Sequence, residues 1–130
     1  MEFQENETVF LEDATGRRNW LKVSFGMVKV QGLGAVDGSK FKGLDDGDSV
    51  TIVGKEYTVF RPGTTDLMGS LDRGAQIITS KDAATILMNC DVRAGDRVLE
   101  IGAGSGGLTT ALLSAVDKKL DKGSKRVVIH

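Results

Sequence analysis

Cysteine, histidine and proline each occur once in this 130-residue sequence, and their scarcity excludes several classes of protein. One cysteine, Cys90, cannot form an intramolecular disulfide, so a reducing compartment is expected. With a single histidine, His130, the sequence has no His/Cys cluster of metal-ligand spacing, and we expect no metal site. No apolar run approaches the roughly 18 residues of a membrane span. The sequence therefore predicts a metal-free globular protein without a membrane segment.

Charge is nearly balanced over the chain but unevenly distributed along it. The net charge of −1 excludes a generally basic protein that holds nucleic acid through its overall charge. Residues 1–13 contain five acids and no base, and they lack the basic start and apolar stretch of a secretory signal. We therefore expect a cytoplasmic protein in which any contact with RNA is local.

Glycines divide the first half of the chain into short strand-like runs. Such spacing is typical of a small all-β domain. The candidate strands are Glu7–Leu11, Trp20–Phe25, Met27–Gln31, Ser49–Val53 and Glu56–Phe60. Pro62 ends the series because it cannot donate a hydrogen bond to a sheet. We therefore place a β domain at residues 1–63.

Residues 64–130 have the pattern of a mixed α/β fold. Apolar residues from Ala83 to Cys90 recur at helical spacing, which predicts a helix capped by Ser80 with Cys90 on its buried face. A short apolar strand, Arg97–Ile101, then leads into a glycine loop and a second helix that ends near Gly123. A further apolar strand, Arg126–Ile129, completes a β-α-β unit, whose strands should pair in parallel.

The glycine loop is the most informative segment for function. Gly102, Gly104 and Gly106 let the backbone approach a ligand, and the following helix start offers N–H donors. The spacing also fits G-x-G-x-x-G through Gly107, so the glycines alone do not separate a dinucleotide fold from a methyltransferase. Glu100 favours a cationic group, such as the amino group of S-adenosylmethionine, over a pyrophosphate. Alternatively, Glu100 orders the loop by accepting its backbone N–H groups, and both roles can coexist.

Four stretches of the sequence share residues with a known family. They are Gly54–Val59 followed by Arg61-Pro62, Arg73–Ile78, Lys81–Ala83 and Gly95–Thr109. Together they resemble the tRNA (adenine-N1-)-methyltransferase family, most of all its archaeal-type members. The glycine motif is common to many methyltransferases, but its combination with Arg-Gly-Ala-Gln-Ile-Ile upstream is specific to this family.

This resemblance implies a β domain that helps to hold tRNA, followed by the first β-α-β unit of a Rossmann-like class I methyltransferase domain. That domain would bind S-adenosylmethionine and methylate N1 of a T-loop adenine. Family members usually form homotetramers, so tRNA and further copies of the chain are the implied partners. The implied cofactor-binding residues are Gln76, Ile77, Ile78, Glu100, Gly102, Ala103, Gly104, Ser105, Gly106, Gly107 and Leu108.

The sequence departs from the family pattern in two ways. Thr79-Ser80 stands where the family usually has Tyr-Pro, which removes a ring contact at position 79. The chain also ends before the acid that holds the ribose and before the catalytic aspartate, so no catalytic residue is assigned in residues 1–130. We expect the N-terminal portion of a longer enzyme, inactive by itself.

Two other function classes stay open, namely a non-enzymatic nucleotide- or RNA-binding module and a fragment of a dinucleotide-dependent oxidoreductase. Trp20 lies among Arg17, Arg18 and Lys22, where a ring could stack on a base while the cations meet phosphate. A core position for Trp20 is nevertheless favoured. Structural roles are also favoured for three further features, which are the linker acids Asp66 and Asp72, the helix-start acid Asp82, and the basic cluster from Lys118 to Arg126.

Overall fold

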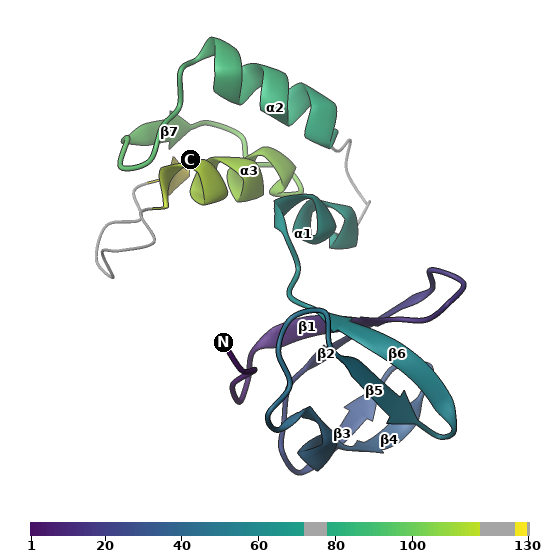
Figure 1. Cartoon of the computed structure of the whole chain (residues 1–130). Helices are drawn as coiled ribbons and strands as arrows, with labels where there is room; N and C mark the ends of the chain where they lie inside the picture. The colour runs from purple at the N-terminus through teal and green to yellow at the C-terminus, as the bar shows by residue number, and fades with distance from the viewer. Residues whose placement is uncertain (72–77, 118–126, 130) are drawn as a thin grey trace. The chain divides into compact units, whose positions relative to one another are not determined.

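The computed structural model describes residues 1–71, 78–117 and 127–129, and the chain divides into two compact units, Met1–Pro62 and Gly63–His130 (Figure 1). In its described residues, the first unit consists of β-strands and one short 3-10 helix. The second combines α-helices with a two-stranded parallel sheet. Each unit has a hydrophobic cluster of its own.

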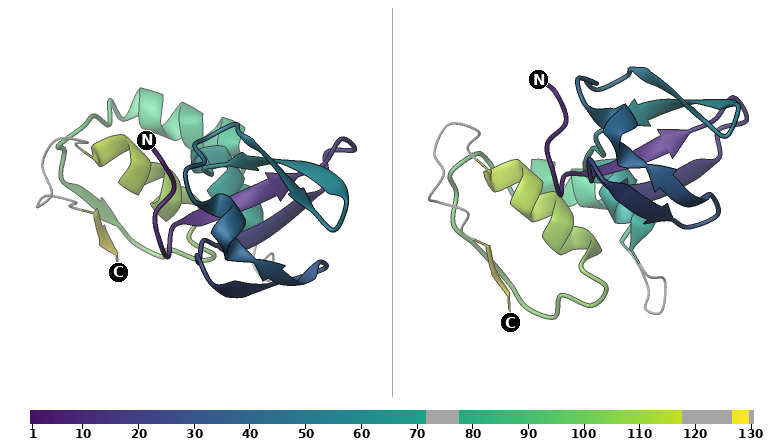
Figure 2. Two further views of the ribbon diagram at one scale, coloured as in Figure 1. Left: turned by 60° about the horizontal axis from the view of Figure 1, so that its bottom comes forward. Right: turned by 90° about the horizontal axis from the view of Figure 1, so that it is seen from below.

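The first unit is built on an antiparallel sheet with the strand order β2-β1-β6-β5 (Figure 2). Its strands are β1 (Thr8–Glu12), β2 (Arg18–Lys22), β5 (Ser49–Ile52) and β6 (Lys55–Phe60). A separate hairpin pairs β3 (Met27–Val30) with β4 (Gly34–Asp37), and the 3-10 helix η1 (Gly38–Phe41) follows. The sequence pattern did not predict β4, because Val36 is the only residue of this strand with a large apolar side chain.

Alternation along the strands places one face of the sheet in the core. Val9 and Leu11 are fully buried in this core, together with Phe3 and Phe41 from outside the sheet. Phe10, between Val9 and Leu11, has the opposite orientation and packs in a tilted arrangement against Trp20 and Phe60 on the neighbouring strands, with ring centroids 5.3 and 5.5 Å away. The expected core position of Trp20 is therefore wrong, because its register opposite Phe10 places it half-buried on the other face.

The second unit contains the predicted β-α-β order, and the parallel pairing of its strands is confirmed. Val98 pairs with Val127 and Glu100 with Ile129. Helix α3 contacts both α1 and α2, and Figure 1 shows α2 and α3 side by side. No helix in the described ranges has the length and apolar character needed to cross a membrane. The elements are α1 (Thr64–Ser70), α2 (Ser80–Asn89), β7 (Val98–Glu100), α3 (Gly107–Val116) and β8 (Val127–Ile129).

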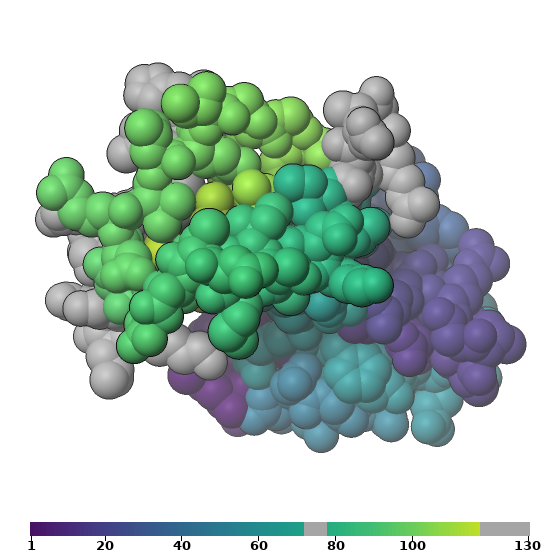
Figure 3. Space-filling model, turned by 90° about the horizontal axis from the view of Figure 1, so that it is seen from above, coloured from purple at the N-terminus to yellow at the C-terminus, as the bar shows by residue number. Residues whose placement is uncertain are grey.

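Three details of the second unit correct the sequence-based expectations. Thr79, rather than Ser80, caps α2, since its Oγ1 accepts a hydrogen bond from the Asp82 N–H at 3.2 Å. Helix α3 ends at Val116, before the expected stop at Gly123, because Asp117 is already extended. Cys90 is exposed rather than buried, because α2 ends at Asn89 and Cys90 is its C-cap. Helix α2 lies at the surface on the face that Figure 3 shows.

Candidate functional site

The loop between β7 and α3 turns through three glycines with positive φ. The angles are +76° at Gly102, +55° at Gly104 and +85° at Gly106, a region that glycine adopts without steric cost. A Cβ built on any of the three would have no neighbouring atom within 4 Å. The backbone conformation, and not packing, therefore requires glycine here, and the space beside the loop is open to a ligand.

Helix α3 begins directly after this loop without a capping side chain. Its N-cap, Gly106, is left-handed, and no side chain of the described residues caps the first turn of the helix. Within the loop, the Gly106 N–H donates to the Ala103 carbonyl at 2.9 Å, which closes a turn around Gly104 and Ser105. The first N–H groups of a helix carry the positive end of its dipole. Because no side chain caps them, these groups are available to acceptor atoms of a ligand.

Glu100 ends β7 and is 7% exposed. Its Oε2 accepts a hydrogen bond from Thr109 Oγ1 at 2.6 Å, and Thr109 is equally buried in the first turn of α3. Among the described residues, no loop N–H donates to Glu100, so the loop-ordering alternative is not observed in the form expected. No enclosed side-chain oxygen of the described residues lacks a partner. The second oxygen, Oε1, has no hydrogen-bond partner among the described residues, so it is not fully enclosed.

These features define what the site can bind. A carboxylate oxygen lies at the strand end, and helix N–H donors follow the open glycine loop. A carboxylate attracts an ammonium group and repels phosphate, whereas N–H donors hold hydroxyl or carboxylate oxygens. The arrangement therefore suits a ligand that carries an ammonium group close to neutral or anionic oxygen atoms.

The remaining predicted site residues fall into three groups. Ile78 and Leu108 are half-buried and pack against the small core formed by Met68, Ala83 and Ala111, so they help to build the second unit. Gln76 and Ile77 lie outside the described residues. The others belong to the loop itself, with Ala103 and Ser105 half-buried and Gly107 buried at the helix start.

Thr109 is the residue to which the sequence assigned no role. It precedes the buried Leu112 and Val116 by three and seven positions, so it occupies the apolar face of α3. A polar side chain at such a position needs a hydrogen-bond partner, and Glu100 is the nearby buried acid. A polar residue at an apolar position of the helix was therefore the sequence signal that could have identified the role of Thr109.

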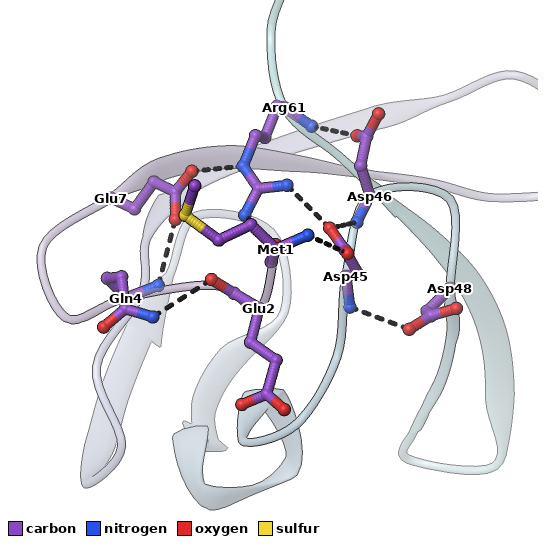
Figure 4. Close-up of polar contacts among 8 residues, drawn as sticks. All are labelled: Met1, Glu2, Gln4, Glu7, Asp45, Asp46, Asp48 and Arg61. Carbon is purple, nitrogen blue, oxygen red and sulfur yellow. Dashed lines mark hydrogen bonds and ion pairs between the residues drawn. The ribbon is translucent and has the colours of Figure 1, made fainter.

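A second polar cluster surrounds Arg61 at the end of β6 (Figure 4). Its Nε lies 2.5 Å from Glu7 Oε1, and its Nη1 lies 2.8 Å from Asp45 Oδ1. Its backbone N–H donates to Asp46 Oδ1 at 2.7 Å, and its guanidinium lies 4.5 Å from the Phe3 ring centroid. The cluster therefore joins the N-terminal segment and the loop before β5 to the last strand of the unit.

Two carboxylates of this cluster, Glu7 and Asp45, have lowered pKa values. Burial raises the pKa of Glu7, but hydrogen bonds from Arg61 and from the Gln4 N–H outweigh it and leave the pKa lowered. Hydrogen bonds from the N-terminal ammonium and from Arg61 lower the pKa of Asp45. Paired acids of this kind stabilise a fold and do not exchange protons near neutral pH. We assign the cluster a structural role.

The other acidic and basic candidates also have structural partners. Asp66 accepts a hydrogen bond from the Gly63 N–H at 2.8 Å, so it caps α1 instead of lying solvated in a linker. Arg18 is paired with Glu12 at 2.7 Å and lies 4.3 Å from the Phe10 ring centroid. Asp72 and the basic residues from Lys118 to Arg126 lie outside the described residues.

Comparison with known proteins gives concordant matches. A family model described as tRNA methyltransferase complex GCD14 subunit matches residues 61–121. The tRNA (adenine(58)-N(1))-methyltransferase TrmI of Thermus thermophilus is 41% identical over 69 residues, which are 53% of this chain and 27% of the relative. The tRNA (adenine(57)-N(1)/adenine(58)-N(1))-methyltransferase TrmI of Methanocaldococcus jannaschii is 30% identical over 109 residues, 83% of this chain and 37% of the relative. The chain thus spans well under half the length of these relatives.

Two solved structures share the fold. The tRNA (m1A58) methyltransferase TrmI of Aquifex aeolicus superposes with a TM-score of 0.63 at 26% identity, over 91% of this chain and 46% of that protein. A SAM-dependent O-methyltransferase of Thermotoga maritima gives a TM-score of 0.72 at 24% identity, over 96% of this chain and 45% of that protein. The expected α/β fold class is confirmed.

Proposed function

We propose that this chain, whose residues 61–121 match the tRNA methyltransferase complex GCD14 subunit family and which resembles the TrmI proteins, is the N-terminal part of a tRNA (adenine-N1-)-methyltransferase. The complete enzyme would transfer a methyl group from S-adenosylmethionine to N1 of a T-loop adenine. The observation that carries the proposal is the buried Glu100, with one oxygen that is not fully enclosed, ahead of an open glycine loop.

The residues of this site fit S-adenosylmethionine. The cofactor carries an ammonium group, for which Glu100 Oε1 is an acceptor, and ribose hydroxyls, for which the helix start offers donors. When bound, it supplies a methyl group on a sulfonium centre that a ring nitrogen can attack. By the family resemblance, the loop from Gly102 to Leu108 would support the methionine and ribose parts, and Gln76, Ile77 and Ile78 would line the cofactor site.

The dinucleotide alternative is less well supported by the same geometry. A pyrophosphate at this loop would approach the Glu100 carboxylate, and like charges at short range oppose binding. We therefore expect S-adenosylhomocysteine to bind the complete protein and NAD not to bind it. Isothermal titration with both ligands distinguishes the two cofactor classes.

The enzyme contributes to such a reaction mainly by positioning the adenine and by electrostatics. Residues 1–63 would help to hold tRNA, and residues 64–130 would begin the cofactor-binding domain. Acids for the ribose and for the adenine would lie in the rest of the protein, and the complete enzyme would be a homo-oligomer. Because those contacts are missing, residues 1–130 alone should bind the cofactor weakly and should not catalyse transfer.

The test compares this chain with the polypeptide at the full length its gene encodes. Both are incubated with unmodified tRNA and S-adenosylmethionine labelled in the methyl group. We expect label in tRNA, as N1-methyladenine in the T-loop, from the longer protein and not from residues 1–130. Transfer by residues 1–130 alone would contradict the proposed division of the enzyme, and no transfer by either protein would contradict the proposed activity.

A further inference from the structure

The Thr109 hydroxyl donates its hydrogen bond to a residue outside its own helix, unlike the hydroxyls of Thr85 and Thr110. Thr110 Oγ1 donates to the Gly106 carbonyl at 2.8 Å, and Thr85 Oγ1 donates to the Lys81 carbonyl at 3.0 Å, each one turn back along its helix. Thr109 Oγ1 instead donates to Glu100 Oε2 at 2.6 Å. A hydroxyl has one proton, so this bond is made in place of a bond to the helix backbone.

The bond restricts the Glu100 carboxylate. A carboxylate at the end of a glutamate side chain turns freely about its last torsion unless one oxygen is held. Here Oε2 is fixed by Thr109 inside the protein, and Oε1 has no partner among residues 1–71, 78–117 and 127–129 and is not fully enclosed. Both residues are 7% exposed, so water does not compete freely for the bond. The hydrogen bond thus holds Oε2 of Glu100 in place and leaves Oε1 to accept a hydrogen bond from a ligand.

We propose that Thr109 is a positioning residue for the amino group of S-adenosylmethionine, acting through Glu100. This inference rests on the proposed function. The effect of Thr109 on binding should be limited to ligands that carry the amino-acid part of the cofactor. A valine has the same shape as threonine but no hydroxyl, so T109V keeps the packing beside Leu112 and releases Glu100 Oε2.

The experiment uses two ligands that share the adenosine part. S-adenosylhomocysteine carries the amino-acid part, and 5′-methylthioadenosine lacks it. Their dissociation constants are measured by isothermal titration on the full-length protein for the wild type, T109V, T109S and E100Q. T110V is the matched control, because it removes a neighbouring threonine hydroxyl that bonds to the helix backbone and not to Glu100.

We expect T109V to weaken S-adenosylhomocysteine about tenfold, which corresponds to one hydrogen bond of about 1.4 kcal/mol to a charged group, and to leave 5′-methylthioadenosine within about twofold. T109S should restore the affinity for S-adenosylhomocysteine. T110V should leave both ligands unchanged. Adding T109V to E100Q should have no further effect, because the residue through which Thr109 acts is already altered.

Other outcomes overturn the proposal in distinguishable ways. Equal weakening of both ligands by T109V would show a general disturbance of the loop, and unchanged affinity for both would show that the hydroxyl only fills a buried position. Either result would leave the proposed function intact, provided that the wild type binds S-adenosylhomocysteine. A wild type that binds neither ligand would contradict the proposed function, and the positioning role would fall with it.

Discussion

Asp13 shows at the scale of single residues how a turn of the first unit is fixed. Its carboxylate accepts hydrogen bonds from the N–H and hydroxyl of Thr15, from the Arg17 N–H at 3.1 Å and from Lys55 Nζ at 2.7 Å. The side chain is 2% exposed. Hydrogen bonds from the Lys55 ammonium and, to a smaller extent, from Thr15 lower the pKa of Asp13. The hydrogen bond to Asp13 in turn raises the pKa of Lys55. The hairpin between β1 and β2 is thereby joined to β6.

This pair predicts a specific acid dependence of stability. Because the pKa of Asp13 is lower in the folded protein than the ordinary value of 3.8, its contribution is complete above that value and is lost as the pH falls below it. Asp13→Asn should therefore lower the melting temperature at pH 7, and the difference from the wild type should narrow below about pH 4. Thermal melts followed by Trp20 fluorescence measure this. Glu56→Gln, at an exposed acid beside Lys55, should leave the melt unchanged at both pH values.

A single methyl group added at Gly38 should strongly destabilise the first unit. A Cβ at this position would lie 1.6 Å from the Ser24 carbonyl oxygen and 2.5 Å from that of Gly26, so backbone atoms would have to move. We expect Gly38→Ala to destabilise the first unit by about 3 kcal/mol in urea unfolding, the upper range for overpacking. Gly26→Ala is the control, since its Cβ would have only one contact, at 3.9 Å, and should cost less than about 0.5 kcal/mol. Similar losses for the two variants would contradict the packing argument.

At the scale of elements, the predictable parts were those with a strong local pattern. The β7-loop-α3-β8 order follows from two apolar runs, a glycine cluster and a helical stripe, and its parallel pairing follows from the crossover between the strands. The short strand β4 was missed because its pairing with β3, and not its composition, makes it a strand. The positions of Trp20 and Cys90 depend on register and on where α2 ends, and neither is encoded in local periodicity.

A substitution in the glycine loop should weaken ligand binding more than it destabilises the fold. Asparagine tolerates positive φ, so Gly104→Asn should cost about 1 kcal/mol or less in stability while its side chain occupies the open space beside the loop. We expect the affinity of the full-length protein for S-adenosylhomocysteine to fall at least about tenfold, or about 1.4 kcal/mol. Gly43→Asn is the matched control, because Gly43 also has positive φ and open space but lies in the first unit. An equal loss of affinity in both variants would contradict the assignment of the loop.

At the scale of the whole molecule, the second unit leaves apolar surface uncovered. Leu99 and Ile101, in and after β7, are 60% and 78% exposed. Parallel sheets are normally covered on both faces and extended by further strands. The local pattern of residues 97–101 predicted a strand but not the exposure of Leu99 and Ile101, because exposure depends on which elements pack against the strand.

We therefore expect residues 1–130 to self-associate in isolation. Unpaired strand edges and exposed apolar side chains favour association, and Leu99→Lys should weaken it by placing a charge on the face of β7. Sedimentation over a range of concentrations measures the effect. Val53→Lys should not change the association, because Val53 is 86% exposed but belongs to a hairpin of the first unit. A single monomeric species at all concentrations would contradict this prediction.

The pairing of the first and last strands of the first unit also has a consequence for folding during synthesis on the ribosome. Strand β1 pairs with β6, and the Glu7 carboxylate binds Arg61, 54 positions later in the chain. Until residue 61 has left the exit tunnel, the edge of β1 that faces β6 has no partner, and the unit cannot close. Once Arg61 emerges, every contact of the unit is available while the second unit is still being made. The nascent chain can thus begin a cooperative folding step of the first unit before the second unit has been fully synthesised.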